Sequence, residues 1–289
     1  PRDRACGLLP WSTLARHGLL VHLHLHTRFG GREPKDAEAQ IEKGRRARRA
    51  RLPRQALLGM LESLRSAVAS LSWTPSGTTW AEYYARSSYA DAALEAKERA
   101  VRDLVARCPA RAMVWDLGSN TGRMLVAALP ADSLGVALDS DPAAVELGWR
   151  DADRRGDART LHLVQDLVNP SPNQGWAQSE REGLAERGPA DVVLALALVH
   201  HLAIGNNVSL RQVADLLARL GRNAIVEFVP KQDGQVERML SGRDDIFSGY
   251  DEAGFEAAMR ARFEVEERIP IPGTGRTLWR LSRREDRPS

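Results

Sequence analysis

Short apolar runs alternate with helical patterns through the middle of the chain. An amphipathic pattern predicts a helix over 92–108, and apolar runs follow at 112–117 and 134–139 with a helical pattern between them. The helical spacing separates the helices from the compact apolar runs, which are typical of buried strands. Consecutive strands joined through a helix form a parallel pair by a right-handed crossover. The carboxyl ends of both strands are therefore expected at the same edge of a sheet.

The same alternation continues and then changes to a hairpin near the end of the chain. Further strands are predicted at 160–167, 190–197 and 223–229, and helices at 142–154 and 209–220. After Asp251 a helix leads to two alternating runs, 263–269 and 276–281, around a loop rich in Pro and Gly. This pattern is typical of an antiparallel hairpin. The sequence therefore predicts an α/β fold, a Rossmann-like doubly wound sheet of seven strands that is mostly parallel with a C-terminal antiparallel hairpin.

Residues 1–72 show helical patterns without strands and are predicted to form an N-terminal helical appendage. Over 55–71, leucine and valine recur at steps of three and four, so this helix has an apolar face to bury. Pro75 and Gly77 mark a linker. We therefore expect two domains, 1–72 and 73–289.

Three histidines alternate with leucines inside the appendage, at His22, His24 and His26. In a strand this spacing would align three imidazoles on one face, as a metal site requires. No Cys, Asp or Glu lies close enough in the sequence to complete a ligand set. We therefore predict no metal and interpret the segment as solvated or partner-facing.

A basic run lies at 43–54, with seven positive charges and no negative one. Such a run can bind the phosphate backbone of a nucleic acid. However, no aromatic residues interleave with it as stacking platforms, and the net charge of the chain is only +3. A solvated helix face is the favoured interpretation, and RNA binding through 43–54 stays open as the alternative.

Composition changes this picture little. The 289 residues are 43% hydrophobic and 27% charged, as in ordinary globular enzymes. No stretch approaches the ~20 apolar residues of a membrane span, so no membrane partner is expected. The two cysteines, Cys6 and Cys108, are far apart and fit a reducing, cytoplasmic location. The chain begins at Pro1 without a methionine, which we interpret as the start of a processed or trimmed product.

A glycine-containing turn follows the first strand, with the pattern Asp116-x-Gly118-x-Asn120-x-Gly122. A dinucleotide fingerprint needs Gly-x-Gly-x-x-Gly, but Asn120 and Arg123 stand at its second and third glycine positions. No Gly-Lys-Ser/Thr follows, so a P-loop is also excluded. These departures argue against an NAD(P)-dependent oxidoreductase, which remains the weaker alternative.

The Asp116–Gly122 pattern closely resembles the first motif of class I S-adenosylmethionine-dependent methyltransferases. The resemblance covers about residues 73–284 and identifies 73–289 as a class I methyltransferase domain. Within that superfamily, the runs 195–205 and 227–231 resemble a poorly characterised bacterial group related to a nodulation host-specificity protein. The resemblance implies S-adenosylmethionine as cofactor and S-adenosylhomocysteine (SAH) as product.

The resemblance also implies roles for three acids that follow successive strands. Asp116 would position the methionine part, Asp139 would hold the ribose, and Asp166 would accept from the adenine amino group. Other residues are expected to contact the cofactor through the glycine-containing turn, the strand ends or the aromatic segment before the first motif: Gly118, Ser119, Asn120, Gly122, Ser140, Leu167, Ala197, Tyr83 and Tyr84. Core packing is an equal alternative for the two tyrosines.

Candidate acceptor-side residues follow the fourth and fifth strands. His200 or His201 can supply a general base with an ordinary pKa near 6.5, and an equal alternative is that an imidazole only hydrogen-bonds backbone at the strand-to-helix turn. Side chains of adjacent residues diverge, so at most one of the two is expected to face the substrate. Glu227 and Lys231 are expected to border the crevice as substrate-binding residues or as a rim ion pair. We predict methyl transfer to an O or N nucleophile, on a small molecule in preference to a macromolecule, with an RNA methyltransferase as the alternative.

Overall fold

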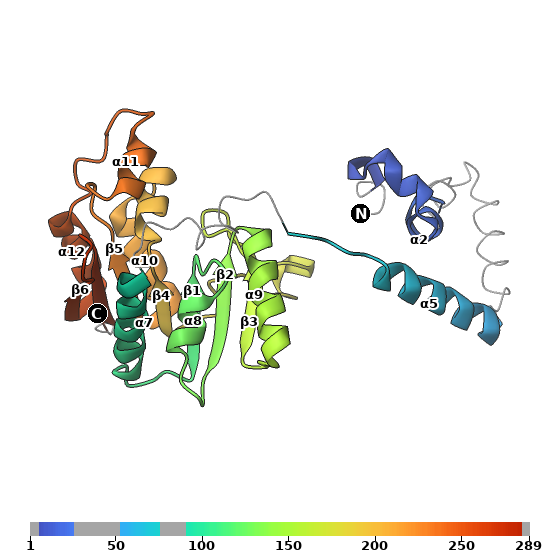
Figure 1. The fold of residues 1–289 in the computed structure, drawn as a ribbon, viewed down its shortest axis with the longest axis horizontal. Helices are drawn as coiled ribbons and strands as arrows, with labels where there is room; N and C mark the ends of the chain where they lie inside the picture. Colours follow the sequence, from blue (N-terminus) through green and yellow to red (C-terminus); the bar gives the residue numbers. More distant parts are fainter. Residues whose placement is uncertain (1–5, 26–52, 76–90, 285–289) are drawn as a thin grey trace. The chain divides into compact units, whose positions relative to one another are not determined.

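The computed structural model describes residues 6–25, 53–75 and 91–284 (Figure 1). The chain divides into two units, residues 1–74 and 75–289, and each is described by itself. Among the described residues, no helix combines the length and apolar character needed to cross a membrane. The basic run lies outside the described residues except for its last two positions, and Tyr83 and Tyr84 lie wholly outside them.

The first unit contains short helical segments packed on one longer helix. The 3-10 helix η1 (Trp11–Ala15), α2 (His17–Leu19) and the π-helix η2 (Leu20–Leu25) precede α5 (Arg54–Ala69). A Cβ on Gly18 would lie 2.4 Å from Ala67 Cβ, so the glycine permits α2 to approach α5 closely. His22 Nε2 lies 3.0 Å from Ser63 Oγ, and His24 Nε2 lies 2.9 Å from Thr13 Oγ1. These two imidazoles therefore join η2 to α5 and to η1.

The second unit contains a seven-stranded sheet in the order β3-β2-β1-β4-β5-β7-β6. Neighbouring strands from β3 to β5 pair in parallel, and β7 runs antiparallel to both β5 and β6. The strands are β1 (Met113–Leu117), β2 (Leu134–Asp139), β3 (Thr160–Val164), β4 (Ala190–Ala195), β5 (Gly221–Phe228), β6 (Phe263–Pro270) and β7 (Thr277–Arg283). This arrangement confirms the predicted Rossmann-like sheet with its C-terminal antiparallel hairpin.

Helices connect these strands as the alternation predicted, together with short helical segments that it did not predict. They are α7 (Asp91–Ala106), α8 (Arg123–Ala128), α9 (Pro142–Arg155), the 3-10 helix η3 (Trp176–Gln178), the π-helix η4 (His201–Gly205), α10 (Leu210–Leu220), α11 (Gly234–Leu240) and α12 (Glu252–Arg260). Ser209 caps α10 by accepting from the Gln212 backbone amide at 3.2 Å. The sequence did not predict α11, whose short apolar pattern gives little periodicity.

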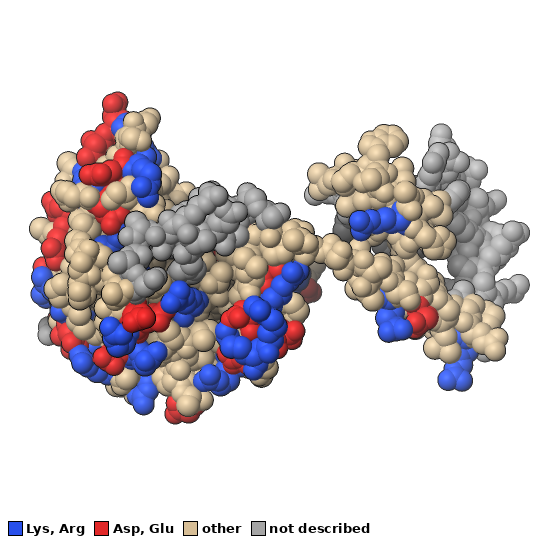
Figure 2. All heavy atoms as spheres, in the orientation of Figure 1, with Lys and Arg blue, Asp and Glu red and all other residues tan. Residues whose placement is uncertain are grey.

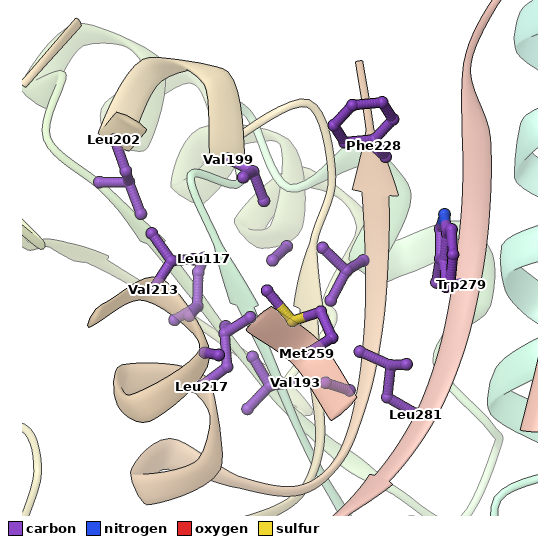
Figure 3. Close-up of a cluster of buried hydrophobic side chains, with 14 of the residues drawn as sticks. Leu117, Val193, Val199, Leu202, Val213, Leu217, Phe228, Met259, Trp279 and Leu281 are labelled. Atoms are coloured by element: carbon purple, nitrogen blue, oxygen red, sulfur yellow. The ribbon is translucent and has the colours of Figure 1, made fainter. Parts of the chain in front are cut away.

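The sheet carries a hydrophobic core on each face, because side chains alternate along its strands. Leu194 belongs to the core that includes α7 and α8 residues, whereas the adjacent Val193 belongs to the other. Figure 3 shows this second core, with Leu217 and Met259 close to Val193 and with Trp279 on β7 in the same cluster. The central strands are thus covered on both sides, which explains their nearly continuous apolar sequences.

The third strand differs from its prediction. The run 160–167 was expected to be a buried strand, but β3 ends at Val164 and Leu161 is 53% exposed. β3 is an edge strand, and the connection from 165 to 189 contains no α-helix to cover this side. His162 is nevertheless buried. Its ring packs directly against Gly122 and Gly148, where an added Cβ would lie within 2.7 Å of it. An apolar run alone does not distinguish an edge strand from a central one.

Candidate functional site

A cavity of about 390 Å³ lies at the carboxyl ends of β1, β2 and β4. It brings together most of the site residues predicted from the sequence. Those that line it are Asp116, Gly118, Ser119, Asn120, Asp139, Ser140, Asp166, Leu167, Ala197 and His201. Ligands of open parallel sheets bind at this edge, where connections diverge from the strand ends.

The turn after β1 is shaped by its backbone. Gly118 has φ 69°, in the left-handed region, and a Cβ there would lie 3.0 Å from Leu198 Cδ1. Glycine reaches this region without the strain that another residue would carry. The backbone amides of Gly118 and Ser119 both donate to the Leu138 carbonyl, at 2.8 and 3.0 Å. The turn is therefore fixed to β2 and presents backbone to the cavity.

Asp116 is a buried carboxyl group on the cavity wall, only 2% exposed. Burial raises the pKa of Asp116 to about 7; the Lys97 ammonium opposes this rise, and the Asp139 carboxylate adds to it. Its Oδ2 and the buried hydroxyl of Ser119 have no hydrogen-bond partner among the described residues. Buried polar atoms are normally paired, so these two are suited to meet a polar ligand.

Asp139 joins the two turns that border the cavity. Its Oδ2 accepts from the Asn120 backbone amide at 2.6 Å, and its Oδ1 accepts from the Asp141 amide at 2.8 Å. Burial raises the pKa of Asp139, although these two amides oppose the rise. Each carboxylate oxygen has two acceptor positions, so the group can accept from a ligand while keeping both turns in place.

Asp166 lies on the exposed side of the cavity, just after β3. Its Oδ1 accepts from the Val168 backbone amide at 2.8 Å, which closes a tight turn. The turn holds the Asp166 carboxylate and the adjacent Leu167 backbone at the cavity wall. Asp116, Asp139 and Asp166 thus line one cavity, although they are separated along the sequence.

The two adjacent histidines differ in position. His201 lines the cavity, whereas His200 does not and is only 1% exposed, with ring centroids 4.1 Å apart. Burial lowers the pKa of His200 to about 3, and positive charge on His201 and Arg276 adds to this shift. Burial and Arg276 also lower the pKa of His201. The His201 imidazole is therefore neutral at pH 7 and able to accept a proton from a group in the cavity.

Three other predicted residues do not line the cavity. Glu227 is fully buried, with Oε2 2.5 Å from Lys97 Nζ and Oε1 3.2 Å from Arg276 Nη1. Lys231 instead pairs with Asp245, at 3.0 and 2.7 Å. The expectation that Glu227 and Lys231 border the crevice or pair with each other is therefore corrected, because neither residue lines the cavity and each pairs with other residues.

Gly122 is the third predicted site residue that does not line the cavity. It precedes α8 with φ 77°, and a Cβ there would lie 2.7 Å from His162 Cε1. Its missing side chain makes room for the buried imidazole and for the left-handed turn into the helix. The structure therefore gives Gly122 a packing role away from the cavity wall.

Several lining residues were not predicted, and most of them are apolar. They are Leu94, Lys97, Met124, Gln165, Val168, Leu196, Leu198, Leu202 and Asn206.

The burial of Lys97 could have been predicted from the spacing of apolar residues in the sequence. Lys97 stands three residues after Leu94 and four before Val101, on the apolar stripe of α7. A lysine within such a stripe is buried with its helix face and needs a partner.

A curated protein is similar to the chain over most of its length. The nodulation protein NoeA of Rhizobium meliloti (strain 1021) is 36% identical to it over 271 residues. The chain is a homologue of NoeA. This confirms the resemblance to a group related to a nodulation protein. The match covers 93% of this chain and 56% of NoeA, so the chain spans little more than half the length of NoeA.

No protein-family model matches the chain. Two of the solved structures that match it are methyltransferases. The magnesium protoporphyrin IX methyltransferase ChlM from Synechocystis PCC 6803, with bound SAH, is 16% identical, and the match covers 71% of this chain and 93% of ChlM with a TM-score of 0.47. The N-methyltransferase NodS from Bradyrhizobium japonicum WM9 is 12% identical, and the match covers 68% of this chain and 98% of NodS with a TM-score of 0.46.

Proposed function

We propose that this protein is an S-adenosylmethionine-dependent methyltransferase. The observation that carries the proposal is the single cavity at the strand ends, lined by Asp116, Asp139 and Asp166. The three acids lie at or near the carboxyl ends of successive parallel strands, so one elongated ligand can contact all of them. The seven-stranded sheet with antiparallel β7 supports the same function, because it is the sheet expected for class I methyltransferases.

The lining residues fit the proposed cofactor. The unpartnered Oδ2 of Asp116 and hydroxyl of Ser119 suit the charged amino-acid part. Asp139 would accept from two ribose hydroxyls, and Asp166 with the Leu167 amide would meet the adenine edge. At Gly118 the absent side chain leaves backbone open to the nucleoside.

The contribution of the chain to the reaction is positioning and proton transfer. When bound, S-adenosylmethionine would supply a methyl group on a positively charged sulfur, and the sulfur would leave with the electron pair of the broken bond as the neutral thioether of SAH. Leu196, Leu198 and Leu202 line the cavity and would exclude water from it. Holding two reactants in the attack geometry removes much of the entropic part of the barrier. His201 would accept the proton when the acceptor must lose one.

The proposed acceptor is a small molecule with an O or N nucleophile. Among the described lining residues, Lys97 is the one Lys or Arg, and it is paired with Glu227. On the face in Figure 2, basic and acidic side chains alternate over α9, where Arg150 pairs with Glu146 and Arg154 with Asp151. A nucleic-acid backbone would require several cations together, so these features favour a small acceptor.

Calorimetry with SAH and with NADH tests the proposed activity. We expect SAH to bind and NADH not to bind, because the glycine-containing turn departs from the dinucleotide pattern at Asn120 and Arg123. A screen of metabolites and RNA with a labelled methyl donor would then identify the acceptor class. Tight NADH binding without SAH binding would refute the methyltransferase proposal, and labelling of RNA alone would refute the small acceptor.

The affinity for SAH is expected to rise with pH through about 7. The ligand ammonium needs an ionised Asp116, whose pKa is raised to about 7 by burial. Below that pH the affinity should fall by up to about tenfold per pH unit, because one proton must be released on binding. The stability of the free protein has the opposite pH dependence. The ordinary pKa of an aspartate is 3.8, so ionisation of the buried Asp116 lowers the free energy of unfolding as the pH rises from about 4 to 7.

Calorimetry from pH 5.5 to 8 measures this dependence. The Asp116→Asn variant serves as the control, since it keeps the shape of the side chain and cannot ionise. It should bind SAH weakly, with little change across the series. A wild-type affinity that is flat over the same range, or a variant that keeps the slope, would exclude Asp116 as the ammonium-binding group.

Replacement of His201 by alanine is expected to lower turnover more than cofactor binding. The His201 imidazole lines the cavity, and its lowered pKa favours the neutral form that can accept a proton. General-base catalysis typically raises the reaction rate by about a hundredfold or more. Once an acceptor is known, steady-state rates and SAH affinity of His201→Ala should be compared. Full turnover by the variant would remove the imidazole from the mechanism.

A further inference from the structure

A short π-helix carries His201 at the cavity wall. η4 runs from His201 to Gly205, and single π-turns of this kind are rare and frequent at functional sites. The last carbonyls of a helix have no partner inside it, so a helix this short is not held by its own hydrogen bonds alone. The direction of the His201 imidazole therefore depends on contacts between η4 and other parts of the chain.

Arg243 supplies two of these contacts from a segment almost 40 positions away. Its Nη1 donates to the Ile204 carbonyl at 2.7 Å, and its Nη2 donates to Asn207 Oδ1 at 2.7 Å. An arginine can cap the last carbonyls of a helix in this way. The guanidinium is planar with its donors in a fixed geometry, so two bonds together fix an orientation that one bond would leave free. Arg243 is thus a side-chain cap for η4.

The segment that carries Arg243 is itself anchored to the sheet. The Phe247 ring centroid lies 4.9 Å from the Arg243 Cζ, and Phe247 packs against the buried core. Tyr250 is 3% exposed, and its hydroxyl donates to the carbonyl of Val229, directly after β5, at 2.9 Å. The arginine therefore extends from a support that is fixed at the carboxyl end of a central strand.

Two further contacts hold η4 in the same place. Asn206 Nδ2 donates to the His201 carbonyl at 2.8 Å, which joins the two ends of the π-helix. α11 lies close to η4 at Gly205, where an added Cβ would be 3.1 Å from Met239 Cε (Figure 1). None of the described lining residues belongs to α11 or to the loop after it. This part of the chain therefore reaches the cavity only through η4.

We propose that Arg243 is a positioning residue that holds the His201 imidazole in the cavity by capping η4. It touches none of the three strand-end acids and acts on the reaction only through His201. This inference rests on the proposed function, because His201 is the proposed base. It also gives α11 and the loop after it a role on the acceptor side of the site.

Proton NMR of the histidine rings tests this role without a known acceptor. The His201 resonance is identified as the one that is missing from His201→Ala. In the wild-type protein it should titrate below the ordinary 6.5, since burial and the Arg276 charge lower the pKa of His201. It should also shift when SAH is added, because the ring lines the cavity. Both properties report where the ring lies.

Arg243→Met is expected to change both properties and to leave cofactor binding intact. The pKa of His201 should rise toward its ordinary value, because an uncapped η4 lets water reach the ring. The shift of the His201 resonance on adding SAH should be largely lost. In calorimetry the SAH affinity should change by less than about twofold, since the acids that would hold SAH are unaltered.

Two variants separate positioning from other effects. Arg243→Lys keeps the positive charge but not the pair of fixed bonds, so it should restore the His201 titration only in part. Arg283→Met is the matched control. Arg283 Nη1 donates to the Ala218 carbonyl at 3.0 Å in the last turn of α10, a helix with no residue on the cavity wall. This variant should leave the His201 titration and its SAH shift unchanged.

The outcomes distinguish this inference from the proposed function. Unchanged His201 resonances in Arg243→Met, full recovery in Arg243→Lys, or equal changes in Arg283→Met would overturn the positioning role and leave the methyltransferase proposal standing. A loss of SAH affinity of about tenfold or more in Arg243→Met would also overturn it, because the effect would then not be confined to His201. A wild-type protein that binds no SAH would overturn the proposed function and this role with it.

A second variant decides the question if Arg243→Met does not fold. Asn207→Gly removes one of the two acceptors, and glycine keeps the left-handed backbone at this position, φ 56°, without strain. The His201 titration should move in the same direction as in Arg243→Met and by less. A wild-type titration in folded Asn207→Gly would overturn the positioning role.

Discussion

The Asp139→Ala variant is expected to lose SAH binding by more than about a hundredfold. In the proposed complex Asp139 accepts from two ribose hydroxyls, and hydrogen bonds to a charged group contribute about 1.5–3 kcal/mol each. The variant also loses the hydrogen bonds that the Asn120 and Asp141 backbone amides donate to this carboxylate, and these bonds hold the turns beside the cavity. Both effects weaken binding, so calorimetry at pH 8 should show a severe loss.

Asp141→Ala is the control for this loss. Asp141 is also buried and accepts from the Ala143 amide at 2.8 Å as the cap of α9, but it does not line the cavity. Loss of a helix cap costs about 1 kcal/mol of stability, without a direct effect on the ligand. SAH binding by Asp139→Ala at wild-type strength, or an equal loss in Asp141→Ala, would contradict the ribose assignment.

Replacement of Arg276 by methionine is expected to destabilise the second unit by about 3–5 kcal/mol, as removal of one partner from a buried ion pair usually does. Arg276 is 3% exposed and donates to both Glu227 and Asp233. Without it, the fully buried Glu227 keeps Lys97 of its two described cationic partners, and the three remaining charges, on Lys97, Glu227 and Asp233, are net negative. Asp233, which caps α11 by accepting from the Gln235 amide, also loses its hydrogen bonds from Arg276.

Urea unfolding followed by tryptophan fluorescence measures this loss. Arg260→Met provides the comparison, since Arg260 pairs with Glu256 at 2.7 Å but is 47% exposed. Exposed pairs contribute about 1 kcal/mol or less, so this variant should unfold close to the wild-type midpoint. A loss of under about 1 kcal/mol for Arg276→Met would show that the buried charges do not depend on one another.

The acids of the candidate site could be predicted from the sequence for a geometric reason. Asp116 and Asp139 lie at or next to the ends of apolar runs, and Asp166 follows a third. Parallel strands in one sheet end at the same edge, so position along each run is enough to place these residues together. The tyrosines 83 and 84 stay predictions, since they lie outside the described residues.

The neighbouring histidines show where local pattern is insufficient. His200 and His201 differ by one position in a turn into the π-helix η4, and only His201 lines the cavity. Which of two adjacent side chains enters a cavity depends on how the turn packs on the sheet. Their adjacent positions in the sequence predicted that the two side chains point in different directions. Which of them enters the cavity could be decided only from the packed structure.

The sequence by itself determined the order along the chain of the strands and of the longer helices, the antiparallel hairpin and the strand-end acids, because each follows from local periodicity and from the geometry of parallel connections. Only the tertiary structure decided that β3 is an exposed edge and that Glu227 pairs with both Lys97 and Arg276. These contacts join α7, β5 and the residue before β7, which are more than 40 positions apart. Pairing over such distances is set by packing of whole elements, and no local pattern encodes it.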